Sequence, residues 1–126
     1  MRTPTAVFVL LALVPGTGHA LQYGDYLKQR QTPAGHAWVA QWLDGFRSGV
    51  HMYDSSQRVE KKQHRFCFQG KLLTTPGLED LIATTVEKKP YLGRHNIGVD
   101  VILFDGLKDA FPCPPPAAPK NPLKAL

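Results

Sequence analysis

Residues 64–70, HRFCFQG, carry one of the two cysteines of this 126-residue chain and decide how its fold is closed. The second cysteine, Cys113, lies in DAFPCPPP at residues 109–116. Each cysteine has a phenylalanine within two residues and lies near a predicted helix boundary. Three roles are open to the pair: a catalytic thiol beside a spare, part of a metal site, or the two ends of one disulfide. The redox compartment of the chain bears on all three.

The first twenty residues have the pattern of a cleavable secretory signal peptide. An apolar run over residues 6–14 follows Arg2, and a Pro-Gly pair then interrupts it. Small residues at the −3 and −1 positions predict cleavage after Ala20. The run is shorter than the roughly 20 apolar residues that a membrane span requires. We therefore expect an exported, periplasmic chain; the alternative is that this stretch forms a buried first helix of the domain.

The remaining residues, 21–126, are enough for one small domain. The formal net charge of +5 at pH 7 is spread along the chain, and Glu60 interrupts the tightest basic group, residues 58–65. This distribution predicts no nucleic-acid partner. No later apolar segment approaches membrane length, so no membrane span is expected. We place the domain at residues 21–113 and expect the proline-rich residues 114–126 to form a disordered tail.

Apolar spacing of three and four predicts an all-α fold of four helices. The first spans about residues 21–30, and a second of about twenty residues follows, capped by Thr32 with Pro33 at its first position. Gly45 and Gly49 indicate either a close backbone approach by a neighbour or simple tolerance of glycine. We interpret the tryptophans of the second helix as core residues. Its apolar stripe consists of Trp38, Trp42, Phe46, Gly49, Val50 and Tyr53.

The third and fourth helices form the second half of the predicted small four-helix bundle, with neighbouring helices antiparallel. Thr75 caps the third helix and Pro90 ends it. The fourth runs from about residue 96 to 110; VDVILF at 99–104 could be a strand, but the three-and-four spacing continues to Phe111 and favours a helix. The inner face of the third helix is Leu78, Leu81, Ile82 and Thr85. The stripe of the fourth is Ile97, Val101, Phe104, Leu107 and Phe111, widened by Ile102 and Leu103.

This arrangement predicts a disulfide between Cys67 and Cys113. Cys67 precedes the third helix and Cys113 follows the fourth, and an antiparallel pair places those two ends side by side. An even number of cysteines in an exported chain favours the same pairing. A catalytic thiol would need a base such as His64 and an open, electropositive pocket, whereas Cys67 has aromatic neighbours. A zinc site of His64 and the two cysteines would lack a fourth ligand.

Other signals of chemistry are missing from the sequence. It holds no glycine-rich phosphate loop and no G-x-S-x-G or H-E-x-x-H motif. Asp105 and Asp109 lie one turn apart with Lys108 between them, which is typical of a solvated helix face. The histidines are scattered and are interpreted as lone surface residues. We therefore predict no catalytic residue, no metal site, no cofactor and no enzymatic activity.

The pattern FCF…LTTPGLEDLI…KKPYLGRHNIGVDVILFDGLKDAFPCP resembles the Rap/Tai immunity-protein family over residues 42–114. Members carry a signal peptide, an aromatic-Cys segment ahead of a Thr-capped helix, and a last helix that ends in Ala-Phe-Pro-Cys. Upstream, WLDGFRSGVHMYD resembles the family's helix with a glycine repeat. The matching positions in this chain are Phe66, Cys67, Thr75, Pro90, His95 and residues 110–113.

The resemblance implies a helical periplasmic protein that binds and occludes a peptidoglycan amidase toxin delivered by type VI secretion, without catalysis of its own. Relatives are often dimeric, so a homodimer is a second implied partner. The alternative function is an exported envelope protein, such as a stress or assembly factor, that uses the same scaffold without a toxin.

The polar segment YDSSQRVEKKQHR at residues 53–65 lacks apolar periodicity and predicts a loop from residue 54 on, with some helix at its start. Because it is long and serves no evident packing, we expect it to contact the partner, through Arg58, Lys61 and Lys62. The alternative is a loop that is only solvated.

Overall fold

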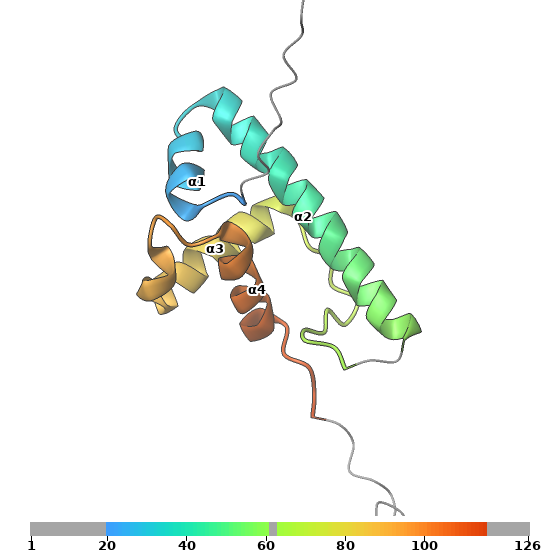
Figure 1. Cartoon of the computed structure of the whole chain (residues 1–126). Coiled ribbons are helices and arrows are strands. Elements are labelled where there is room, and N and C mark those ends of the chain that lie inside the picture. The colour runs from blue at the N-terminus through green and yellow to red at the C-terminus, as the bar shows by residue number, and fades with distance from the viewer. Residues whose placement is uncertain (1–19, 61–62, 116–126) are drawn as a thin grey trace, which may run out of the picture.

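The computed structural model describes residues 20–60 and 63–115, which form four α-helices, one 3-10 turn and no strand. The elements are α1 (Tyr23–Gln29), α2 (Pro33–Val59), α3 (Thr75–Lys88), η1 (Pro90–Gly93) and α4 (Val99–Ala110). The long α2 runs diagonally along one side, and α4 packs on α3 (Figure 1). The prediction of an all-α domain of four helices closed by one disulfide is confirmed. None of the described helices combines the length and apolar character needed to cross a membrane.

Several predicted segments fall outside the described residues. The signal peptide does so except for residue 20, and the proline-rich tail does so except for residues 114–115. The described chain begins in firm contact with the domain, because Leu21 is buried and its carbonyl accepts a hydrogen bond of 2.8 Å from the N–H of Val99.

α2 begins where the sequence predicts and ends later. The hydroxyl of Thr32 accepts a hydrogen bond of 3.1 Å from the N–H of Gly35, and Pro33 takes the first helical position. The helix then continues to Val59, so the helix predicted at the start of the polar segment is present and extends over its first half. The cause is Asp54, a polar residue that occupies the next inward position of the helix and is buried there.

The starts of α3 and α4 also differ from the prediction. Thr74, not Thr75, caps α3, because its hydroxyl accepts the N–H of Gly77 at 3.1 Å. α4 begins at Val99 and not near residue 96. The backbone before Val99 is used instead to hold α1, since the carbonyl of Ile97 accepts the N–H of Tyr23 at 2.8 Å.

The buried faces of α2 and α4 overlap the predicted stripes only in part, since Val50, Ile102, Leu103 and Leu107 are buried as predicted and other stripe residues are not. On α4, Val101 is 50% exposed and Phe104 41% exposed, although the spacing predicts both on the inner stripe. On α2, Trp38 is 47% exposed, so its interpretation as a core residue is wrong, whereas Trp42 is half-buried against the core. Aliphatic residues, together with Gly106 and Asp54, take the inner positions. These are Val39, Leu43, Val50 and Asp54 on α2, and Val99, Ile102, Leu103, Gly106 and Leu107 on α4.

One interpretation of Gly45 and Gly49 is that a neighbour approaches α2 closely. The close helix approach in the structure is instead between α3 and α4. A Cβ added to Gly106 would lie 2.3 Å from Oγ1 of Thr85 and 3.0 Å from Cγ of Leu81. A Cβ added to Gly45 or Gly49 would meet nothing within 4 Å. Within the domain, the two glycines of α2 are therefore tolerated, not required.

The stretch around Cys67 adds two aromatic side chains, Phe66 and Phe68, to the core. Because successive side chains of an extended chain alternate, Phe66 and Phe68 enter the core while Cys67 between them reaches Cys113. The Cα atoms of the two cysteines are 4.9 Å apart, and the N–H of Cys67 donates to the carbonyl of Phe111 at 2.8 Å. The rings of Phe66 and Phe68 lie 5.2 Å apart, and Phe68 packs edge-on against Phe111 at 5.1 Å.

Tyr26 of α1 is fully buried, and no described residue pairs with its hydroxyl. The guanidinium of Arg30 lies 5.2 Å from the centre of its ring. Burial raises the pKa of Tyr26 to about 12. The hydroxyl is thus a polar group that has lost its water without gaining a partner, which costs about 1–3 kcal/mol.

We expect Tyr26→Phe to stabilise the domain by about 1 kcal/mol at pH 7, because the substitution removes that hydroxyl and keeps the ring. In the wild type, the folded pKa of about 12 lies above the unfolded value, so the unfolded chain loses its proton first as the pH rises. The pKa difference of Tyr26 adds to the free energy of unfolding in full below roughly pH 10, and this contribution falls as the pH rises from there to about 12. Urea unfolding at pH 7 and pH 11 measures both effects. A Phe variant that is less stable at pH 7 would contradict the unpaired hydroxyl.

Candidate functional site

The predicted partner-binding residues belong to the carboxyl end of α2 and the segment after it. Lys61 and Lys62 lie outside the described residues. Arg58 lies in the last turn of α2, not in a loop, and its guanidinium is 3.0 Å from Oδ2 of Asp54. Arg58 is exposed but already paired, so it belongs to a polar cluster within the domain.

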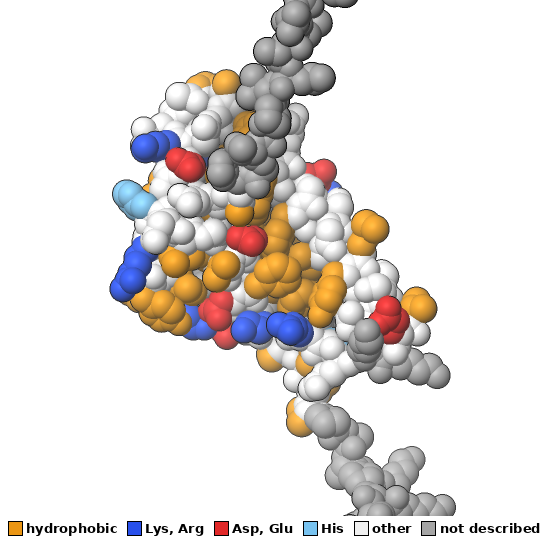
Figure 2. Space-filling view, viewed as in Figure 1, with side chains coloured by type: hydrophobic (Ala, Val, Ile, Leu, Met, Phe, Trp, Pro, Cys, Tyr) orange, Lys and Arg blue, Asp and Glu red, His pale blue; other side chains and the backbone are white. Residues whose placement is uncertain are grey.

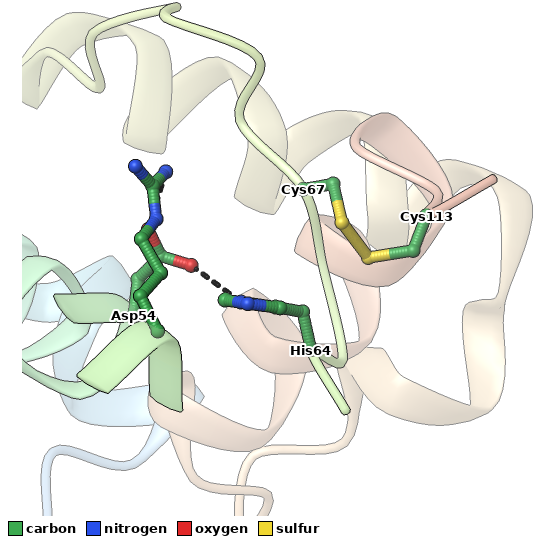
Figure 3. The surroundings of a disulfide bond; sticks show 5 residues. Asp54, His64, Cys67 and Cys113 are labelled. Carbon is green, nitrogen blue, oxygen red and sulfur yellow. Dashed lines mark hydrogen bonds and ion pairs between the residues drawn. A yellow bond between two sulfur atoms is a disulfide. The ribbon is translucent and has the colours of Figure 1, made fainter. Parts of the chain in front are cut away.

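That cluster consists of Asp54, Arg58 and His64, next to the disulfide (Figure 3). Asp54 and His64 point toward each other from α2 and from the segment that leads to Cys67, with Nδ1 of His64 3.0 Å from Oδ1 of Asp54. An ionised carboxylate can only accept, so Nδ1 carries the proton and donates it. His64 is therefore a half-buried, paired residue, and its interpretation as a lone surface histidine is wrong.

The cluster is suited to holding the chain in place. Asp54 joins α2 to the segment that enters the disulfide, and a pocket of about 270 Å3 lies beside it, lined in part by Cys67 and Pro114. An Asp–His pair could orient a base beside a thiol nucleophile. Here Sγ of Cys67 is bonded to Sγ of Cys113, so it is not a thiolate in this form. Among residues 20–60 and 63–115, no three His, Cys, Asp or Glu side chains gather as a metal site.

We expect Asp54→Ala and His64→Ala each to lower the free energy of unfolding, with a coupling of about 1 kcal/mol between the two changes. The reason is that either substitution breaks the same hydrogen bond, so the double variant should lose less than the sum. Urea unfolding of the two single variants and the double variant completes the cycle. Additive losses would mean that the pair does not hold the segment to α2.

The larger candidate site lies between α2 and α4 and consists of Trp38, Trp42, Phe46, Val101 and Phe104, here called the α2–α4 face. Its rings are packed in sequence: Trp42 stacks on Phe46 at 5.8 Å, and Phe46 meets Phe104 edge-on at 5.5 Å. Figure 2 shows hydrophobic side chains gathered over the junction of the two helices. Contiguous exposed apolar surface of this kind is typical of protein-binding sites.

The apolar spacing of the sequence marks these aromatic residues and predicts that they belong to the core. The signal that could have corrected it is aliphatic: Val39, Leu43 and Val50 form a second stripe on α2, beside the aromatic one. A helix that carries two adjacent apolar stripes has more apolar surface than one neighbour can cover. The aromatic stripe of α2 is the one that remains partly exposed.

The charges at the border of this face are largely paired. The ammonium of Lys89, at the end of α3, donates to Oδ2 of Asp105 at 2.5 Å and to Oδ2 of Asp109 at 2.8 Å, both on α4. These hydrogen bonds raise the pKa of Lys89 above its usual range, and the bond from Lys89 lowers the pKa of Asp109. The two aspartates are thus an ion-pair contact between α3 and α4, and not only a solvated face.

Comparisons with known proteins add no relative to this description. No family model matches the chain, and no curated protein or solved structure matches it significantly. A functional assignment therefore depends on the residues, the geometry and the motif resemblance given above.

Proposed function

We propose that this chain is a periplasmic immunity protein of the Rap/Tai kind, which binds and occludes a peptidoglycan amidase toxin delivered by type VI secretion. The observation that carries the proposal is the α2–α4 face, in which Trp38, Val101 and Phe104 are exposed. Aromatic residues dominate the energetics of protein interfaces because they bury much area with few rotatable bonds. This surface suits a partner protein better than a small substrate.

The scaffold under that face is suited to blocking an enzyme. An occluding protein binds tightly when its contact residues are held in their bound arrangement before the encounter. Phe104 is held from beneath by Phe66, whose ring lies 6.1 Å away, and Phe66 adjoins the disulfide-bonded Cys67. A disulfide is compatible with an extracytoplasmic protein. Export through the predicted signal peptide would place the chain in such a compartment.

The first experiment is co-purification of the mature, oxidised chain with type VI amidase effectors, followed by a peptidoglycan cleavage assay. Tight binding together with loss of cleavage is the expected result. Binding without inhibition would contradict occlusion. Failure to bind any such amidase would favour the alternative of an exported envelope protein, either a stress factor or an assembly factor.

Within that assay we expect Trp38→Ala to weaken amidase binding about 30-fold, the size of an interface hot spot of about 2 kcal/mol. Because Trp38 is 47% exposed and lies outside the buried core, the free energy of unfolding of the free domain should fall by less than about 2 kcal/mol, so the variant stays folded for the assay. Tyr91→Ala is the matched control, since Tyr91 is an exposed aromatic residue of η1, away from the face. Equal binding by both variants would remove the α2–α4 face from the interface.

A further inference from the structure

A pocket of about 320 Å3 opens at one end of the α2–α4 face and is lined by Tyr53, Arg65, Phe104 and Lys108. Three separate parts of the chain meet there. Tyr53 comes from α2, Phe104 and Lys108 from α4, and Arg65 from the segment that leads to the disulfide. Phe104 belongs to both the pocket and the face, so the two are continuous.

The described residues place few carboxylates near the two cations of the pocket, Arg65 and Lys108. Arg65 is exposed and makes no ion pair with any of them. The carboxylate oxygen within reach of the Lys108 ammonium is Oδ1 of Asp105, at 3.8 Å. Asp105 also accepts from Lys89 at 2.5 Å, so its charge is shared. The pocket thus carries a net positive charge at its rim.

The aromatic walls of the pocket are held in place by the core. The ring of Tyr53 lies 6.1 Å from the ring of Phe66, and the ring of Phe104 also lies 6.1 Å from it. Phe104 also contacts Phe46 at 5.5 Å. Because Phe66 is fully buried, neither wall needs to be ordered when a ligand enters.

We infer that this pocket receives an acidic side chain, Asp or Glu, of the protein partner. The short aliphatic stem of such a residue packs against the rings of Tyr53 and Phe104. Its carboxylate accepts charge-assisted hydrogen bonds from Arg65, which can bind both oxygens, and from Lys108. A phosphate would satisfy the cations but has no apolar stem for the rings. The inference deepens the proposed function and rests on it where the partner is taken to be an amidase.

Charge complementarity also explains why the pocket lies beside the face and not within it. Lys and Arg side chains border the hydrophobic patch on one side (Figure 2). In a protein interface, an apolar centre supplies most of the affinity, and a charged pair at the edge sets the register of the partner. An acidic residue in the pocket would therefore orient the partner's apolar residues over Trp42 and Val101.

The test uses a probe that does not depend on knowing the partner. The tripeptides acetyl-Leu-Glu-Leu-amide and acetyl-Leu-Gln-Leu-amide are titrated into the 15N-labelled, mature, oxidised protein and followed by NMR. The Glu peptide should shift the amide resonances of Arg65, Phe104 and Lys108 and bind about tenfold more tightly than the Gln peptide. The preference should disappear in the double variant Arg65→Gln/Lys108→Gln.

Lys28→Gln/Lys71→Gln is the matched control, because it removes two exposed cations from outside the pocket and lowers the net charge equally. This variant should keep the preference for the Glu peptide. Equal affinity for the two peptides, or an equal effect of both double variants, would overturn the inference, since only general attraction would remain.

The pocket variant Arg65→Gln/Lys108→Gln also separates this inference from the proposed function, when its binding to an amidase is measured. Suppose that an amidase binds the wild type and Arg65→Gln/Lys108→Gln equally well. The immunity role then stands, and the inference that the pocket receives an acidic residue of the amidase does not. Suppose instead that no amidase binds, but the wild-type pocket still binds the Glu peptide more tightly than the Gln peptide. The inference about the pocket then stands and the immunity role does not.

Discussion

Replacing Cys67 by serine is expected to lower the free energy of unfolding by about 4 kcal/mol, the largest single effect in the domain. The disulfide joins residues separated by 46 positions, and closing a loop of that size removes about this much entropy from the unfolded chain. The total free energy of unfolding of a small domain is only about 5–15 kcal/mol. Urea unfolding of the oxidised wild type and of Cys67→Ser measures the loss.

Two controls identify the disulfide as the cause of that loss. Cys113→Ser and the double variant should be destabilised as much as Cys67→Ser, because each removes the same bond. Reductant should bring the wild type to the same midpoint and leave the variants unchanged. If Cys67→Ser unfolds at the urea concentration of the oxidised wild type, the disulfide contributes nothing to stability, and the noncovalent contacts of Phe66, Phe68 and His64 hold this segment.

Gly106→Val is expected to destabilise the domain by about 3 kcal/mol, the upper range for overpacking a core. The first added carbon would lie 2.3 Å from the hydroxyl oxygen of Thr85, at a position that no side-chain rotation changes, and the two methyl groups of valine add further bulk. α4 would have to move away from α3, which would also strain the contact of Lys89 with Asp105. Thermal or urea unfolding at neutral pH gives the loss.

The matched control for Gly106→Val is Gly49→Ala on α2, where an added Cβ meets open space. This change should stabilise the domain by about 1 kcal/mol, because alanine is a better helix former than glycine at an interior position. Opposite signs at the two glycines would show that packing, not helix propensity, decides the effect. A stable Gly106→Val variant would mean that α3 and α4 do not approach each other as closely as described.

The order of the helices and the pairing of the cysteines follow from the sequence by itself. Thr32 and Pro33 start α2, and Pro90 and Pro112 end the last two helices, through constraints that act within a few residues. The pairing of the disulfide follows from the count, since two cysteines allow only one pairing, and from the antiparallel order expected of the last two helices. An alternating FCF places both phenylalanines inward once Cys67 is bonded. Signals of this kind do not depend on what lies opposite each helix.

Only the tertiary structure decided which of the aromatic residues of α2 and α4 remain exposed, whereas the predicted inner residues Leu78, Ile82 and Thr85 of α3 are buried. The spacing of Trp38 and Phe104 marks an apolar stripe, but whether a neighbour covers it depends on the direction in which α2 and α4 cross. Asp54 extends the inner face of α2 because His64 and Arg58 supply its partners, one of them from outside the helix. Burial and charge pairing depend on contacts between residues far apart in the chain, and a periodic pattern within one helix does not carry that information.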